Sequence, residues 1–361
     1  MITIIGSPQP VFFEATQEKS TMFETATERA DESFKFICRN ILEHGSFDEN
    51  PRPKYSDGTP AHTYSVNHVV QIFDLNKGDF PLISLRNIAV KSAIGEILWI
   101  YKDQSNDLKK LAEYGVTWWD KWDIGDGTIG QCYGKTVKDH KIINDLIKNL
   151  KNDPDSRRHI INLYQYGDFE KEFGLKPCAL YSEYNVRYKG NDAYLDGFLL
   201  LRSSDYVMAG AINQVQYIAL LMMLAQICGY KVGTFTCTLV NCQIYDRHVD
   251  AVKEMLYRVS IPANPYLEIT NDCKNLDEFK LNDFKIRDYP RDIINIKNPK
   301  LKLDIGIWKV SLSKNRGKNL SCGFFILQNF MQQLIRMWFF HFHFQMYLNV
   351  YLSQYYLQKY L

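Results

Sequence analysis

Cys178, in the stretch GLKPCALY (174–181), is the residue of this sequence best suited to act as a nucleophile. A cysteine attacks as the thiolate, so nearby cations that favour the anion would activate it. Arg157, Arg158 and Arg202 flank Cys178 along the chain. The alternative is an inert core thiol, because unpaired cysteines are among the most buried residues of globular proteins. Taken alone, the local sequence favours the inert thiol.

A lone carboxylate provides a second candidate. Glu96 and Lys91 are the polar interruptions of the apolar run RNIAVKSAIGEILWIY (86–101), which predicts a buried helix. Burial raises the pKa of a carboxyl group and fits it for general acid and base work. The alternative is a salt bridge with Lys91 or Arg86, but neither lies three or four residues from Glu96.

Three tryptophans, Trp118, Trp119 and Trp122, precede a glycine-rich turn (125–130). Its glycines match the pattern GxGxxG, yet no apolar strand comes before them, which argues against a dinucleotide-binding fold. The tryptophans are either ordinary core or a flat wall for a planar ligand. The segment NCQIYDRH (241–248) ends a predicted strand and carries a polar cluster, Asn241, Gln243, Tyr245 and His248.

Periodicity predicts the elements that position these residues. Helical spacing favours helices over residues 30–45, 86–101, 139–153 and 212–230, with Gly229 ending the last and Asn213 near its start. Alternation favours strands over residues 63–75, 181–188 and 193–207, with others after 158 and from 231. We expect an irregular N-terminal extension (1–29), a single catalytic domain (30–307) and an aromatic-rich C-terminal tail (308–361), for which a membrane span is disfavoured.

Composition limits the class of protein. The 361 residues are 46% hydrophobic and carry a formal net charge of +2, which is far from the basic excess of a surface that coats nucleic acid. The eight cysteines show no metal-ligand spacing, so we expect no metal site and no disulfide framework. The N-terminus lacks the features of a secretory signal. These observations predict a cytoplasmic protein that binds neither membrane nor DNA.

A set of motifs in consistent order resembles the thymidylate synthase family, in particular its firmicute and phage branch. The motifs are RPKYSDGTP (52–60), GEILW (95–99), TWWDKW (117–122), DSRRHI (155–160), KPCALY (176–181), RSSD (202–205) and QIYDRH (243–248). The resemblance covers residues 30–307. It implies an α+β fold with a mixed, curved sheet flanked by helices, and a homodimer in which the sheets pack together.

The resemblance also implies a reaction, the reductive methylation of dUMP to dTMP with 5,10-methylene-tetrahydrofolate as donor of carbon and hydride. Cys178 would attack C6 of the uracil ring, and Arg202 beside the sulfur would favour the thiolate. Glu96 and Tyr133 would move protons at O4 and C5. The implied phosphate clamp comprises Arg52, Arg202 and Ser203, with Arg157 and Arg158 reaching in from the partner subunit.

The remaining implied roles concern selectivity and the folate. Asn213 would read N3-H and O4 of uracil, which excludes cytosine. Gln243 and Tyr245 would bind the deoxyribose, and Gln243 stands where many relatives have histidine. Trp119 and Asp205 would contact the pterin, and Trp119 would also screen the reaction intermediate from water.

Three departures from the family pattern leave alternatives open. The common histidine after the nucleophile is Ala179, and the segment before Asn213 reads MAGAI (208–212). The tail (308–361) continues where relatives end, and we expect it to hinder closure of the site, so that its deletion would raise turnover. The alternative reaction is deoxyuridylate hydroxymethylation, in which water replaces hydride. A silent nucleotide-binding or RNA-binding protein is a third alternative, which the near-neutral charge disfavours.

Overall fold

The computed structural model describes residues 24–169, 175–304 and 306, and the backbone of residues 2–4 and 11–13. The chain divides into two compact units, Met1–Val310 and Ser311–Leu361. The second unit, and with it the predicted tail (308–361), lies outside the described residues.

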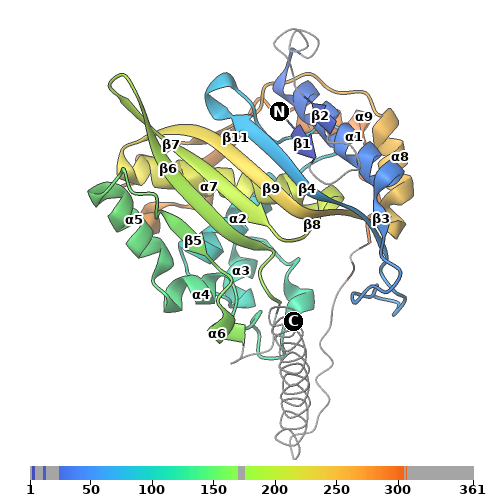
Figure 1. Ribbon diagram of the computed structural model, residues 1–361, viewed down its shortest axis with the longest axis horizontal. Coiled ribbons are helices and arrows are strands. Elements are labelled where there is room, and N and C mark those ends of the chain that lie inside the picture. The colour runs from blue at the N-terminus through green and yellow to red at the C-terminus, as the bar shows by residue number, and fades with distance from the viewer. Residues whose placement is uncertain (1, 5–10, 14–23, 170–174, 305, 307–361) are drawn as a thin grey trace, which may run out of the picture. The chain divides into compact units, whose positions relative to one another are not determined.

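A nine-stranded mixed sheet forms the centre of the first unit (Figure 1). Its order is β2-β1-β4-β9-β7-β6-β5, with β3 paired to β4 and β8 paired to β9. Strands β7 and β8 run parallel to β9, and the other pairs are antiparallel. The strands are β1 (Ile2–Ile4), β2 (Val11–Phe13), β3 (Ser46–Phe47), β4 (Thr63–Asp74), β5 (Ile160–Asn162), β6 (Ala179–Lys189), β7 (Asp192–Leu201), β8 (Ser204–Asp205) and β9 (Lys231–Tyr245).

Helices and a small hairpin surround this sheet. The helices are α1 (Ala26–His44), α2 (Val90–Tyr101), α3 (Leu108–Glu113), α4 (Gly134–Asp139), α5 (Ile142–Asn152), α6 (Tyr166–Phe169), α7 (Ala211–Cys228), α8 (Val249–Tyr257) and α9 (Arg291–Lys297). Strands β10 (Tyr266–Ile269) and β11 (Phe284–Arg287) pair antiparallel. The predicted α+β class is therefore confirmed, with register shifts in β6 and β7 that bend the sheet.

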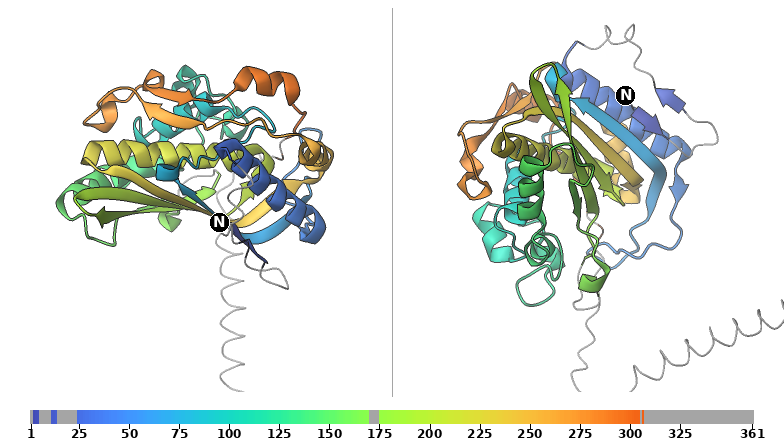
Figure 2. Two further views of the ribbon diagram at one scale, coloured as in Figure 1. Left: turned by 90° about the horizontal axis from the view of Figure 1, so that it is seen from above. Right: turned by 60° about the vertical axis from the view of Figure 1, so that its left-hand side comes forward.

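Helix α7 is the central layer. It packs against β7 and β9 on one side and against α2 on the other, and Figure 2 shows it between the sheet and the outer elements. A helix covered on both sides must be apolar all round, which explains its sequence. Gly229 ends it in the left-handed conformation with φ 77°, as predicted. Residues Tyr206–Cys228 are long and apolar enough for a membrane span, but the segment is largely buried inside the protein.

The opposite face of the sheet is more exposed. Buried and half-buried residues alternate along β7 and β9, because successive side chains point to opposite faces. Buried members pack under α7. Half-buried members on the other face are mostly apolar or small, and include Phe198, Leu200, Thr236, Thr238 and Val240.

The structure corrects three predicted boundaries. Helix α1 begins at Ala26 rather than at residue 30, because Thr25 and Glu28 form a capping box. Helix α2 begins at Val90, since residues 86–89 form a loop. The extension predicted to be irregular contains β1 and β2, and β1 pairs with β4.

Candidate active site

The site is a cavity of about 990 Å³ at one end of the sheet. The cavity is lined by every residue for which the sequence predicts a role, apart from Arg157 and Arg158. They come from elements far apart in the chain, among them α2, β8, β9 and the start of α7. The predicted members that line the cavity are Arg52, Glu96, Trp119, Tyr133, Cys178, Arg202, Ser203, Asp205, Asn213, Gln243 and Tyr245.

Cys178 lies one residue before β6 and is half-buried in the cavity wall. Its backbone N–H donates to the hydroxyl of Tyr133 over 3.0 Å. Tyr133 has φ 46°, a strained value for a residue with a side chain. The next residue, Gly134, has no room for a side chain, because a Cβ there would lie 2.2 Å from the carbonyl oxygen of Ser105. The strained turn thus places the Tyr133 hydroxyl against the backbone of Cys178, the candidate nucleophile.

Arg202 holds the loop that carries Cys178. Its backbone N–H donates to Cys178 O over 2.9 Å. Its side chain donates from Nε to Pro177 O over 3.0 Å and from Nη2 to Lys176 O over 2.8 Å. Burial raises the pKa of the Cys178 thiol, and the Arg202 charge lowers it by less. The expected direction of the Arg202 effect is therefore correct, but burial outweighs it and the resting thiol is protonated.

Glu96 lies in α2 with 6% of its surface exposed. Burial raises its pKa, and the N–H groups of Trp119, Trp118 and Gln216 oppose the rise. The alternative salt bridge with Lys91 or Arg86 is wrong: Lys91 is exposed, and Arg86 Nη2 donates to the carbonyl oxygens of Val207 and Met208 over 2.6 and 3.1 Å. Glu96 is thus a buried carboxyl group beside neutral donors, and its raised pKa makes it a candidate for acid and base catalysis.

Asn213 occupies the third residue of α7, directly after a π-helical turn, Tyr206–Gly210. Its Nδ2 donates to Gln216 Oε1 over 3.0 Å, which leaves one N–H and the amide oxygen for a ligand. Asp205 caps the turn by accepting from the backbone N–H of Met208 over 3.3 Å. Arg86 donates to the carbonyl oxygens of Val207 and Met208 in the same turn, so Asp205 and Arg86 together hold the N-terminal end of the segment 208–212.

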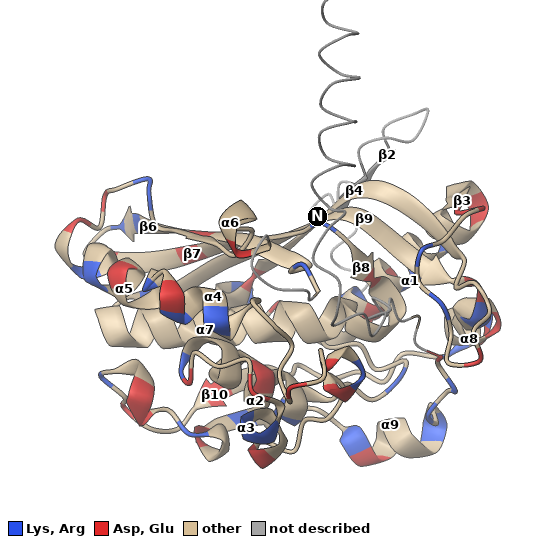
Figure 3. Ribbon diagram, turned by 90° about the horizontal axis from the view of Figure 1, so that it is seen from below, with Lys and Arg blue, Asp and Glu red and all other residues tan. Residues whose placement is uncertain are grey.

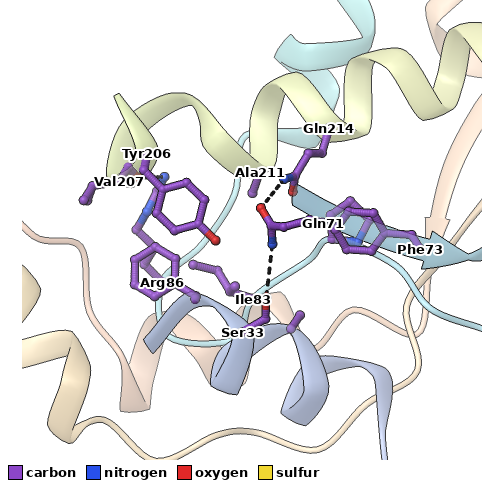
Figure 4. A pocket seen from close by; sticks show the side chains of 12 residues that line it. Ser33, Gln71, Phe73, Ile83, Arg86, Tyr206, Val207, Ala211 and Gln214 are labelled. Carbon is purple, nitrogen blue, oxygen red and sulfur yellow. Dashed lines mark hydrogen bonds between the residues drawn. The ribbon is translucent and has the colours of Figure 1, made fainter. Parts of the chain in front are cut away.

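A second, small cavity of about 20 Å³ lies behind this turn, and its volume fits one water molecule. Figure 4 shows Gln71 between α1 and α7 in its wall. Gln71 Nε2 donates to Ser33 Oγ over 3.1 Å, and Gln214 Nε2 donates to Gln71 Oε1 over 2.7 Å. This buried chain of amides and a hydroxyl ties α7 to β4 and α1, and we assign it a structural role.

The last described residues contribute to the same site. Gly306 lines the cavity and packs against Tyr245. His248 Nε2 bonds the carbonyl oxygen of Asp304 over 2.5 Å, and its Nδ1 lies 3.7 Å from Asp205 Oδ1. Burial lowers the pKa of His248, but Asp205 and the Asp304 carbonyl outweigh burial and raise it. The sequence placed His248 in a polar cluster without a role, and here it joins the segment near residue 304 to the predicted pterin contact.

Arg157 and Arg158 are exposed in the loop before β5 and do not line the cavity of their own chain. This placement agrees with, but does not test, a role in a partner's site. Arg52 is exposed at the cavity rim. Figure 3 shows basic and acidic residues interspersed over helices such as α5 and α9, rather than a basic stripe of the kind that binds RNA.

The described residues contain no cluster of three or more metal-ligating side chains. What the cavity does combine is a thiol, a buried carboxyl group, a tyrosine hydroxyl, guanidinium groups and an amide with free donor and acceptor. Such a set can add a nucleophile to an electron-poor ring, move protons at that ring and hold a phosphate.

Comparison with known proteins agrees with the motifs. Residues 32–300 match the family described as thymidylate synthase. The chain is 44% identical over 281 residues to the thymidylate synthase of Lactococcus lactis subsp. cremoris (strain SK11), an alignment that spans 77% of this chain and 99% of the relative. It is 43% identical to the Streptococcus sanguinis (strain SK36) enzyme over the same shares of both chains.

A solved structure shares the fold. The thermostable thymidylate synthase A from Bacillus subtilis superposes with a TM-score of 0.67 at 33% sequence identity. The superposition covers 77% of this chain and 99% of that one. Both kinds of comparison thus leave roughly a quarter of this chain unmatched while they span nearly all of each relative.

Proposed function

The chain belongs to the thymidylate synthase family, and from that premise we propose how its own residues carry out the family's reaction. The reaction is the reductive methylation of dUMP to dTMP, with 5,10-methylene-tetrahydrofolate as co-substrate. The observation that carries the assignment of residues is the gathering of Cys178, Glu96, Asn213 and Arg202 around one cavity. The family match and the named relatives do not favour hydroxymethylation of dUMP, the alternative reaction.

Cys178 is the proposed nucleophile. Its sulfur adds to C6 of the uracil ring, which makes C5 electron-rich and able to attack the one-carbon unit. Because burial keeps the resting thiol protonated, the S–H bond breaks as the carbon–sulfur bond forms, and the proton passes to O4 of the uracil ring, where Glu96 moves protons. Tyr133 supports this step by accepting the Cys178 N–H, which orients the loop and leaves the hydroxyl proton of Tyr133 free.

Glu96 and Asn213 act on the ring from the α2 and α7 side. Asn213 has one N–H and its amide oxygen left for O4 and N3-H of uracil, a pattern that a cytosine ring reverses. An amide that discriminates by unpaired polar groups excludes the wrong base strongly. Glu96, with a raised pKa, moves protons at O4 and C5.

The nucleotide's phosphate and sugar bind at the other end of the cavity. Arg202, Ser203 and Arg52 form one side of the phosphate clamp, and planar guanidinium groups suit a phosphate dianion because each donates two bonds. Gln243 and Tyr245 lie side by side at the end of β9, where the sugar hydroxyl would meet them. Gln243 keeps a donor and an acceptor where relatives use histidine.

The same cavity fits the folate. Its volume lies at the upper end of the range of about 300–1,000 Å³ for ligand pockets, which leaves room for two ligands side by side. Trp119 packs edge-on against Trp122 and Tyr133, with ring centroids 5.3 and 5.5 Å apart, and presents an aromatic wall to a pterin. When bound, the folate supplies the one-carbon unit and the hydride, and Asp205 accepts from the pterin N–H groups.

The half-buried apolar face of the sheet is the proposed homodimer interface. Residues such as Phe198 and Leu200 are poorly placed for contact with water and suit a second sheet. Arg157 and Arg158 would then complete the phosphate clamp of the partner's site. We further propose a cytoplasmic location, a catalytic domain whose expected bounds (30–307) extend back to Ala26 with α1, and a tail (308–361) that hinders closure of the site.

The test of the reaction is product analysis. Mixing the protein with dUMP and methylene-tetrahydrofolate should give dTMP by mass spectrometry and an absorbance rise from dihydrofolate. Cys178→Ser should abolish turnover, and Cys228→Ser, which changes another half-buried thiol, should not. A hydroxymethylated product without dihydrofolate would overturn the proposed reaction, and turnover by Cys178→Ser would overturn the proposed nucleophile.

Subunit sharing has a separate test. Inactive Cys178→Ser protein is mixed with an inactive Arg157→Ala, Arg158→Ala double variant under conditions that exchange subunits. A hybrid dimer has one site with an intact cysteine from one chain and intact arginines from the other, so activity should return. Mixtures that stay inactive despite proven exchange would place the arginines outside the partner's site.

A further inference from the structure

Trp118 makes a direct hydrogen bond to the candidate acid and base of this site. Its indole Nε1 donates to Glu96 Oε2 over 2.5 Å. Trp118 is half-buried and lines the cavity, at the turn before the short helix Asp120–Trp122. The family resemblance gives a role to its neighbour Trp119 and none to Trp118.

The other donors near Glu96 are differently placed. Trp119 Nε1 and Gln216 Nε2 are buried and have no partner of good hydrogen-bond geometry, although both lie close enough to lower the pKa of Glu96. Buried N–H groups without partners are costly, so these two are available to substrate or water. Of the three donors, Trp118 is the one that forms a hydrogen bond of good geometry with the carboxyl group.

An indole donor suits this task. It carries one N–H and no acceptor, it is neutral, and it does not ionise near neutral pH. Because the indole is neither an acid nor a base in this pH range, it orients a carboxyl group without competing for the protons that the carboxyl group transfers. The torsion that turns a glutamate carboxyl group is otherwise broad, so an unrestrained Glu96 would sample many orientations.

We propose that Trp118 is a positioning residue for catalysis: its N–H fixes one oxygen of Glu96 so that the other oxygen faces the uracil ring. This inference rests on the proposed role of Glu96 as acid and base. It adds a residue to which the resemblance assigns no role, and it gives the two adjacent tryptophans different roles. Trp119 screens the reaction, and Trp118 aims the carboxyl group.

The test is Trp118→Phe, which keeps an aromatic ring and removes the N–H. A lost hydrogen bond to an ionised group should lower kcat about tenfold or more. Because the bond favours the charged form of Glu96, its loss should move the acidic limb of the kcat–pH profile up by about one unit. The dissociation constant for dUMP should stay within about threefold, since Trp118 acts through Glu96.

Trp99→Phe is the matched control. Trp99 lies on α2 three residues after Glu96, is fully buried, and also donates an indole N–H, to Asp107 O over 2.9 Å. Its replacement should lower the thermal midpoint without moving the acidic limb. If Trp118→Phe does not fold, Trp118→Leu also lacks the donor and should show the same shift.

The outcomes separate this inference from the proposed function. If Glu96→Gln loses turnover while Trp118→Phe keeps the wild-type kcat and pH profile, the role of Trp118 is refuted and that of Glu96 stands. If Glu96→Gln keeps full turnover, the proposed role of Glu96 fails first. A kcat loss in Trp118→Phe without any pH shift would also overturn the inference, because it would indicate structural damage alone.

Discussion

Asp31 should make the stability of this protein fall as the pH rises from acid to neutral. This carboxyl group lies in α1 with 0% of its surface exposed. It accepts from the backbone N–H of Ser84 over 2.7 Å and from Ser84 Oγ over 2.5 Å. Ser84 Oγ in turn accepts from the N–H of Ile261 over 2.7 Å, so the cluster joins α1 to the loops before α2 and after α8.

Burial raises the pKa of Asp31 from 3.8 to about 6, although the Ser84 bonds oppose the rise. Between these values the folded protein holds a proton that the unfolded chain has released, so the free energy of unfolding decreases as the pH rises. The 2.2-unit difference corresponds to about 3 kcal/mol above pH 7, at about 1.36 kcal/mol per unit. About 2 kcal/mol of this loss falls between roughly pH 4.5 and 7.5.

The assay is urea unfolding of wild type and Asp31→Asn across this pH range. Protein concentration is held constant, because subunit association contributes to apparent stability. The stability advantage of wild type at low pH should shrink by about 2 kcal/mol at neutral pH, or reverse, since the asparagine does not titrate. Ser84→Ala removes a bond that favours the charged form, so it should enlarge the pH-dependent loss. Parallel curves for wild type and Asp31→Asn would refute the reasoning.

Two further predictions concern the nucleophile and its support. Alkylation of Cys178 by iodoacetamide, without added substrate, should reach half its maximal rate above pH 9, because burial raises the pKa of the thiol from 9.0. Arg202→Ala should move this midpoint to a still higher pH, because it removes the charge that lowers the pKa. A midpoint near neutral pH would contradict the burial argument. Gly134→Ala should destabilise the protein by about 1–3 kcal/mol and lower kcat, because the added methyl group would overlap Ser105 O and displace Tyr133. An unchanged thermal midpoint would contradict this prediction, because it would show that the backbone of the turn can shift at little cost.

Elements with a clear period were predictable from the sequence. Alternation over residues 63–75 matches β4, and the apolar run with Gly229 at its end matches α7. Strands β1 and β2 were missed because three residues carry no period, and β1 exists through its pairing with β4. The earlier start of α1 was readable in principle, because Thr25-Ala-Thr-Glu28 has the form of a capping box.

Within the site, the identities of the residues were easier to predict than the effect of burial and charge on their pKa values. Arg202 was expected beside Cys178, and it lies there because its backbone N–H bonds Cys178 O. The extent of burial around the sulfur depends on packing among distant segments, which no local pattern reports. The choice of Trp118 over Trp119 as the bonded donor to Glu96 likewise depends on side-chain directions in a turn.

The balance at Cys178 has a consequence for how the nucleophile arises. Two N–H groups of Arg202 donate to the carbonyl oxygens of Pro177 and Lys176, and a bound phosphate would partly neutralise the same positive charge. In the proposed reaction, nucleotide binding at Arg202 therefore does not by itself favour a free thiolate, and the S–H bond breaks as the bond to C6 forms. Since oxidation of a cysteine follows its thiolate character and exposure, a thiol that is protonated until substrate is in place is also protected between turnovers. Burial, which keeps the Cys178 thiol protonated in the resting protein, would thus restrict its reactivity to the complex with bound substrate.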